Sequence, residues 1–137
     1  MKSLYEQFKT NPALEQDGVV LDFGGPKFRV RRTGGANRKY KAIFSAKIRP
    51  FSRAIANGSF SEEKSDEVLK DVFFEAVMVD WANVTDEANN PLEFNKANFL
   101  KVMNDLPDLW SAIRQEADNI KNFQDETAEA DGENLGN

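Results

Sequence analysis

The 137-residue chain contains no cysteine and no histidine. Without these residues it cannot form a disulfide, a zinc site of the Cys/His type, a thiol nucleophile or a histidine general base. No stretch approaches the roughly 18 apolar residues that span a bilayer, since the longest apolar cluster runs only from Ala76 to Val79. Glu6 and Lys9 interrupt the segment where a signal peptide would be apolar. These absences favour a soluble cytoplasmic protein and remove most of the side chains that catalysis ordinarily uses.

The residues that are present predict one domain. Hydrophobic residues make up 40% of the chain and charged residues 30%, which is typical of a soluble globular domain with an ordinary core. Large apolar residues almost disappear after Gln124, where the sequence becomes acidic. We therefore predict a single globular domain over residues 1–123, followed by an acidic, disordered tail over residues 124–137.

Local patterns in the first half of the chain predict a short helix, a hairpin and a longer helix. Residues 4–8 carry apolar side chains at helical spacing, and Asn11-Pro12 is expected to end that helix. Alternating apolar residues on both sides of Gly24-Gly25-Pro26 predict a β-hairpin over residues 18–32, with one basic face on its second strand. An apolar stripe predicts a helix over residues 37–56.

Further patterns predict where the following helices begin and end. Pro50 lies inside the helix just described, so we expect a kink or two consecutive helices there. Ser59 and Glu62 fit a capping box, and the wide apolar stripe that follows predicts the most buried helix, running to about Trp81. Residues 84–94 predict a small hairpin or an extended loop.

The last elements complete the expected fold class. Asn95 is placed to cap one helix, and Pro107 is placed at the first position of another helix that reaches Phe123. The whole pattern predicts an α+β fold that is predominantly helical. In this fold the N-terminal β-hairpin packs on four to five amphipathic helices.

Charge is distributed unevenly along the chain. Residues 27–53 contain ten basic residues and no acidic residue, whereas the remainder contains 8 basic and 23 acidic residues. The formal net charge of −5 therefore combines +10 in this segment with −15 elsewhere. The segment fits three alternatives: charges that are solvated or paired within the chain, a surface for an acidic partner, or a nucleic-acid site. A fourth alternative is that the acidic tail folds back over it.

No motif for catalysis or phosphate binding stands out. Gly24-Gly25-Pro26 lacks the spacing of a phosphate-binding loop. Asp80 and Asp86 are expected to have surface or capping roles, although Asp80, beside Trp81, could be a buried and hydrogen-bonded acid. Gly34–Lys39 opens a helix with basic residues, which offers either an anion site at the helix N-terminus or a plain flexible turn. We expect no enzyme activity, no cofactor and no metal.

A broader pattern is carried by segments spread in order over about residues 4–123: Leu4–Thr10, Leu14-Glu15, Gly18–Phe23, Arg31–Tyr40, Arg49–Ile55, Asp80–Asp86, Asn90–Phe94 and Leu106–Leu109. Together they resemble the tail assembly chaperones of long-tailed (siphovirus-type) bacteriophages. None of these segments is a catalytic signature, and the acidic tail lies outside the resemblance.

The resemblance implies a non-enzymatic, virus-encoded assembly factor in the host bacterial cytoplasm. Such chaperones bind the long helical tape measure protein, keep it soluble and help recruit tail tube subunits. They are not expected in the mature virion. Many exist also in a longer, frameshifted form whose added domain contacts the tail tube protein. Self-association along the tape measure protein is a further expectation.

The partner-binding surface is expected on the basic segment and the aromatic residues near it. A holdase needs apolar contact area together with charge for solubility, and amphipathic helices can offer both in one groove. The aromatic candidates are expected to contact a partner only where they are exposed. The candidate residues are Arg31, Arg32, Arg38, Lys41, Arg49, Arg53, Tyr40, Phe51 and Phe60.

Two alternative functions remain open at the level of sequence. The first is a small nucleic-acid-binding phage regulator that uses residues 27–53, although the chain has no obvious recognition helix or zinc module. The second is a structural tail completion protein that would stay in the virion. We expect no membrane partner.

Overall fold

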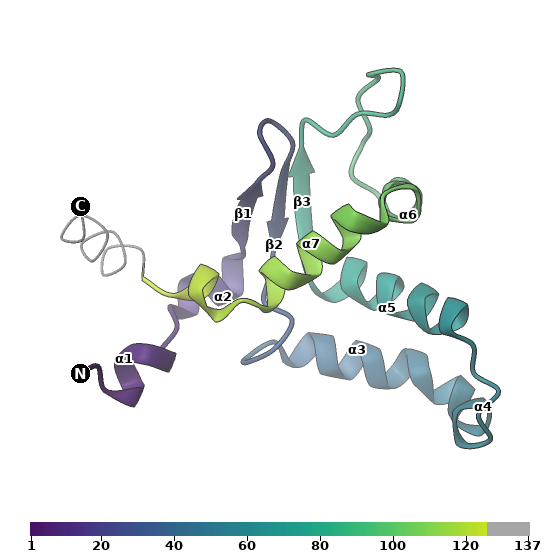
Figure 1. The fold of residues 1–137 in the computed structure, drawn as a ribbon, viewed down its shortest axis with the longest axis horizontal. Coiled ribbons are helices and arrows are strands. Elements are labelled where there is room, and N and C mark those ends of the chain that lie inside the picture. The colour runs from purple at the N-terminus through teal and green to yellow at the C-terminus, as the bar shows by residue number, and fades with distance from the viewer. Residues whose placement is uncertain (126–137) are drawn as a thin grey trace.

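The computed structural model describes residues 1–125 and has an α+β fold that is mostly helical (Figure 1). An antiparallel sheet of three strands, in the order β1-β2-β3, forms its centre. Helix α7 crosses in front of the sheet in Figure 1, while α3 and α5 extend away from its lower end. This architecture confirms the predicted fold class, including the N-terminal hairpin.

Strands β1 (Val19–Asp22) and β2 (Lys27–Val30) form the predicted hairpin. Gly24 and Gly25 both have positive φ, and the Asp22 carboxylate accepts hydrogen bonds from their N–H groups at 2.9 and 3.2 Å. The left-handed backbone favours glycine, and the aspartate fixes the turn. Local residue choice therefore explains why the hairpin was predictable.

The third strand corrects the prediction of a helix that runs to Trp81. Helix α5 (Glu62–Ala76) ends earlier, and Met78–Ala82 forms β3, which pairs with β2. The Trp81 indole donates a hydrogen bond to the Leu92 carbonyl at 2.9 Å and lies on the buried face. The apolar spacing over this segment suits both a helix and a strand. The strand forms because it can pair with the edge of β2 that β1 leaves open.

The N-terminal segment forms two short helices, α1 (Leu4–Phe8) and α2 (Pro12–Asp17). Asn11-Pro12 follows the first helix, as predicted, but it also begins the second. The Asn11 side chain accepts a hydrogen bond from the N–H of Ala13, and Pro12 occupies the first helical position, which suits its fixed φ. Neither helix has a buried residue.

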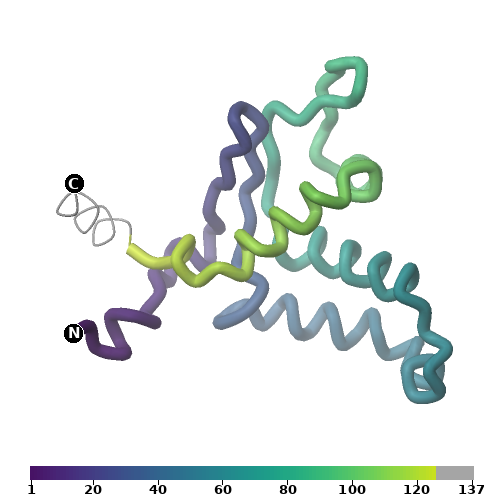
Figure 2. Tube along the Cα trace, viewed as in Figure 1, coloured from purple at the N-terminus to yellow at the C-terminus, as the bar shows by residue number. Residues whose placement is uncertain are grey.

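Of the two outcomes predicted at Pro50, a kink or two consecutive helices, the structure shows two consecutive helices. Helix α3 (Arg38–Ile48) passes into a 3-10 turn, η1 (Arg49–Phe51), and then into α4 (Ser52–Ala56). We call residues 41–56 the arm. Figure 2 shows α3 of the arm running alongside α5, and the chain reverses direction near α4.

The cap of α5 differs from the predicted capping box. Ser61, not Ser59, is the N-cap residue, and its hydroxyl accepts a hydrogen bond from the N–H of Lys64 at 3.1 Å. Ser59 instead uses its own N–H to bond the Asn57 side chain in the turn before the helix. Two serines two residues apart both precede acidic residues, so the sequence offers two caps and the turn geometry selects one.

The remaining helices follow the expected starts. Asn95 caps α6 (Lys96–Asp105), and Pro107 is the first residue of α7 (Pro107–Asp118). The last helix ends before Phe123, and a separate 3-10 turn, η2 (Ile120–Phe123), follows it. Residues 83–95 form an extended loop closed by one isolated bridge between Thr85 and Pro91 rather than a regular second hairpin.

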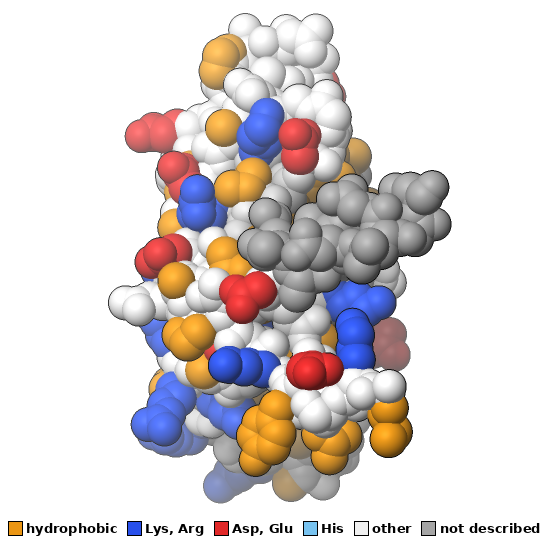
Figure 3. Space-filling view, turned by 90° about the vertical axis from the view of Figure 1, so that its left-hand side faces the viewer, with side chains coloured by type: hydrophobic (Ala, Val, Ile, Leu, Met, Phe, Trp, Pro, Cys, Tyr) orange, Lys and Arg blue, Asp and Glu red, His pale blue; other side chains and the backbone are white. Residues whose placement is uncertain are grey.

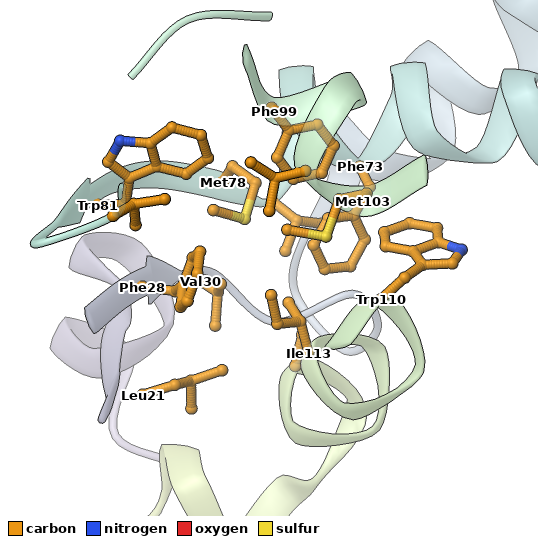
Figure 4. Packing of buried hydrophobic residues seen from close by; sticks show 14 of the residues in the cluster. Leu21, Phe28, Val30, Phe73, Met78, Trp81, Phe99, Met103, Trp110 and Ile113 are labelled. Atoms are coloured by element: carbon orange, nitrogen blue, oxygen red, sulfur yellow. The ribbon is translucent and has the colours of Figure 1, made fainter. Parts of the chain in front are cut away.

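The core lies between the sheet, α5, α6 and α7. Figure 4 shows Phe28, Trp81 and Val30 of the sheet on one side and Phe99, Met103 and Ile113 of the helices on the other. Several aromatic rings meet edge to face, as Phe73 and Trp110 do at 5.0 Å between centroids. Among residues 1–125, no helix is long and apolar enough to cross a membrane. The predicted tail largely falls outside the described residues.

A candidate basic interface

The ion pairs of the basic segment show how far its charge is neutralised. Lys27 pairs with Asp22, Arg32 with Glu15 and Lys47 with Glu75, at 3.8, 3.0 and 3.2 Å. The other cations of residues 27–53 have no ion pair within residues 1–125. They are Arg29, Arg31, Arg38, Lys39, Lys41, Arg49 and Arg53. Most of the basic segment is therefore available to bind an anionic group from outside the described part.

Part of this charge gathers around a cleft of about 540 Å³ between α2, the end of β2 and the start of α3. We call it the arginine cleft. It brings together three of the predicted site residues, Arg31, Arg32 and Arg38. Its full lining is Pro12, Glu15, Gln16, Arg31, Arg32, Ala36, Asn37, Arg38 and Lys39.

Hydrogen bonds hold the walls of the arginine cleft in place. Arg31 donates through Nε to the Gln16 carbonyl at 2.8 Å, and Arg32 bonds the Glu15 carboxylate. Asn37 caps α3 by accepting from the N–H of Tyr40, and its amide donates to the carbonyl of Arg32 at 2.7 Å. The segment Gly34–Lys39, for which the sequence left an anion site and a plain turn open, is a turn that leads into the capped start of α3, where Arg38 and Lys39 are exposed.

A second group of cations lies along the arm. Lys41, Arg49 and Arg53 are exposed there, beyond the arginine cleft. Exposed apolar side chains accompany them: Ile55 exposes 47% of its surface and Phe44 36%. The sequence stripe contained both residues but gave no sign that they would face solvent. The arm therefore combines positive charge with apolar contact area.

The three predicted aromatic contacts are half-buried rather than exposed. Tyr40 stacks with Phe44 at 6.4 Å between centroids, and burial raises its pKa above the usual value. Phe51 and Phe60 pack together at 5.2 Å, with the Lys64 ammonium 5.3 Å from the Phe51 ring. These rings lie on the inner side of the arm. The sequence spacing therefore identified the apolar stripe but not the residues that are exposed to a partner.

A further exposed apolar surface lies on α1. Leu4, Tyr5 and Phe8 are among the most exposed large hydrophobic residues of the described chain. Figure 3 looks onto this end of the molecule, where hydrophobic side chains lie at the surface near lysines and arginines. Helical spacing placed these residues on a helix but did not indicate that they would be left uncovered.

The acidic residues considered for chemistry have structural surroundings. Asp80 is exposed on β3 and accepts a hydrogen bond from the N–H of Trp81, so it is not a buried acid. Asp86 accepts from the N–H groups of Asn90 and Ala88, and these bonds, that of Asn90 first, lower its pKa. Within residues 1–125, no group of three or more acidic side chains is arranged to hold a metal ion.

The sequence model of the YdaY prophage protein family matches residues 35–134. The chain belongs to this family. The match begins just before α3 and includes the arm, α5, β3, α6 and α7, but not the β1-β2 hairpin. Membership confirms the phage origin that the resemblance implied, and the YdaY match also extends into the acidic tail. Searches of curated proteins and of solved structures gave no significant match.

Proposed function

We propose that this YdaY-family protein is a non-enzymatic tail assembly chaperone that binds the tape measure protein of its phage. In this role it keeps the tape measure protein soluble and helps recruit tail tube subunits. Support comes from the phage origin of the family and from the resemblance across residues 4–123. The observation that carries the proposal is the arm, where exposed apolar side chains lie together with cations that have no ion pair within residues 1–125.

The chemistry of the arm fits one kind of partner, an amphipathic helix with acidic flanks. Ile55 and Phe44 offer apolar contact, which drives association when it is buried. Lys41, Arg49 and Arg53 are exposed and have no ion pair within residues 1–125, so they would select an acidic partner and orient it. A long tape measure protein made of helices presents many such segments in succession, and several copies of the chaperone would then line up along it.

Co-expression with the tape measure protein of the same prophage tests this proposal. The wild-type chain should raise the soluble fraction of the tape measure protein severalfold and co-purify with it. The variant K41E/R49E/R53E should lose both effects, since it reverses the charge of the arm without touching the core. A matched control, K2E/K9E/K121E, changes net charge equally at exposed positions outside the arm and should retain them.

Nucleic acid is the competing occupant of the arm, because unpaired Lys and Arg side chains also contact phosphates. A mobility-shift assay with duplex DNA and with RNA separates the two partners. The chaperone proposal expects no shift at physiological salt. A steeply salt-dependent shift that K41E/R49E/R53E abolishes, combined with no effect on the tape measure protein, would favour the regulator instead.

A further inference from the structure

We propose that the arginine cleft is a binding site for an acidic peptide, and that its occupant is residues 126–137 of the same chain. This inference concerns the cleft beside α2 and does not depend on the chaperone function, which rests on the arm. It assigns a role to the cations that the described residues leave unpaired at this end of α3.

The cleft has the charge that an acidic peptide requires. Arg31, Arg38 and Lys39 line it without an ion pair within residues 1–125, and Glu15 is its one acidic lining residue, already bound to Arg32. The Nε of Arg32 is buried and has no hydrogen-bond partner in the described structure. A buried donor without a partner is costly, so this wall of the cleft has hydrogen-bonding capacity that the described residues leave unused.

The path of the chain brings the tail to the rim of the cleft. The Phe123 carbonyl accepts a hydrogen bond from the N–H of Asn11 at 2.8 Å, and the Asn11 amide donates to the Asp125 carboxylate, also at 2.8 Å. Asn11 directly precedes Pro12, which lines the cleft. Twelve residues can extend over about 40 Å, so the segment that follows Asp125 has ample reach.

The composition of the tail complements the cleft. Residues 126–137 contain four acidic residues and no basic one, and the YdaY match, which ends at residue 134, includes all four. A short tether holds a segment at an effective concentration of order 1 mM, so a Kd of about 100 µM would keep the cleft about 90% occupied. The arm is a less favoured site for the tail, because α4 lies at the end of the molecule opposite Asp125, where the described chain ends (Figure 1).

Proximity in the full-length chain tests this assignment directly. Because the chain has no cysteine, Leu135→Cys creates a single position for a nitroxide label. In the ¹⁵N-labelled protein, the amide signals of residues 36–39 should lose more than half their intensity, while those of residues 53–56 should not. The tail variant E126Q/E129Q/D131N/E133Q should remove the effect.

Two results would overturn the inference. One is equal broadening at the cleft and at the arm, or none at either. The other is broadening in a mixed sample in which the ¹⁴N protein carries the spin label and the observed ¹⁵N protein does not. Such a result would place the tail in the cleft of another copy rather than its own.

A peptide of residues 126–137 gives an independent measurement by fluorescence anisotropy. It should bind the full-length tail variant at least tenfold more tightly than the wild type, whose cleft is already occupied. Adding R38Q/K39Q, two exposed positions, should abolish binding, whereas adding R49Q/R53Q on the arm should not. Equal affinity for wild type and tail variant, or loss of binding only with the arm substitutions, would contradict the proposal.

Discussion

Helices α3 and α5 lie side by side but have opposite relations to the rest of the molecule. Helix α5 buries Val68, Lys70, Val72, Phe73 and Ala76, and both of its lysines are in ion pairs. Helix α3 buries no residue, and Lys47 is the one cation of its four with an ion pair in residues 1–125. The comparison shows that α5 belongs to the core, whereas α3 packs on α5 and leaves its outer face exposed to solvent.

Two phenylalanines on these helices give the largest expected contrast. Phe73 of α5 is fully buried against Phe99 and Trp110, so Phe73→Ala should lower the free energy of unfolding by about 3–5 kcal/mol. Phe44 of α3 is exposed, and Phe44→Ala should cost less than about 1 kcal/mol. Urea denaturation followed by tryptophan fluorescence measures both. Equal losses would mean that α3 is part of the core.

Two lysines give the next contrast. The Lys70 side chain of α5 is buried and pairs with Asp66, while its ammonium donates to the Asn104 side chain at 2.7 Å. Lys70→Ala leaves these acceptors without their donor and should cost about 2 kcal/mol. Lys41→Ala on α3 should change stability by less than about 0.5 kcal/mol. Chemical denaturation of both variants under identical conditions checks the difference.

The start of α5 allows a finer test with two serines. Ser61→Ala removes the side chain that accepts from the N–H of Lys64 and should cost about 1 kcal/mol. Ser59→Ala removes only a weak contact of its hydroxyl with the Ala54 carbonyl at 3.5 Å and should lower the free energy of unfolding by about a few tenths of a kcal/mol. A larger loss for Ser59→Ala in thermal unfolding would restore the capping box that the sequence predicted.

The smallest effect concerns Tyr40, where α3 meets its support. Burial raises the pKa of Tyr40 above its usual value of 10.0, so the folded protein keeps the phenol neutral where the unfolded chain ionises. Its contribution to stability is therefore complete below pH 10 and declines as pH rises through the folded pKa. Unfolding free energies of wild type and Tyr40→Phe, measured at pH 9 and pH 11, should diverge at the higher pH. Parallel values would contradict this burial.

Much of the fold was predictable because its signals are local. Gly24-Gly25, Pro50 and Pro107 act through backbone geometry, which depends on few neighbours. Strand β3 is not predictable in this way, because its apolar spacing is also compatible with a helix. What makes it a strand is pairing with β2, a contact between residues about fifty positions apart.

The candidate site was predictable in outline only. The sequence revealed the basic segment, but ion pairing depends on contacts such as Lys47 with Glu75, which are distant in the chain. It could not show that α2, which precedes the hairpin in the chain, would close one side of the arginine cleft. The exposed fractions of Phe44 and Tyr40 likewise follow from how α3 is rotated against α5, which no local signal specifies.

The hydrogen bond between Asn11 and Phe123 also bears on how the protein folds. These residues are separated by almost the whole described chain, so this contact closes one of its largest loops at a high entropic cost. Helices α1 and α2 bury nothing, and we expect their release to leave the core intact. The first 17 residues should therefore dock last during folding and open most often afterwards, as a separate cooperative unit at the end of an otherwise persistent structure.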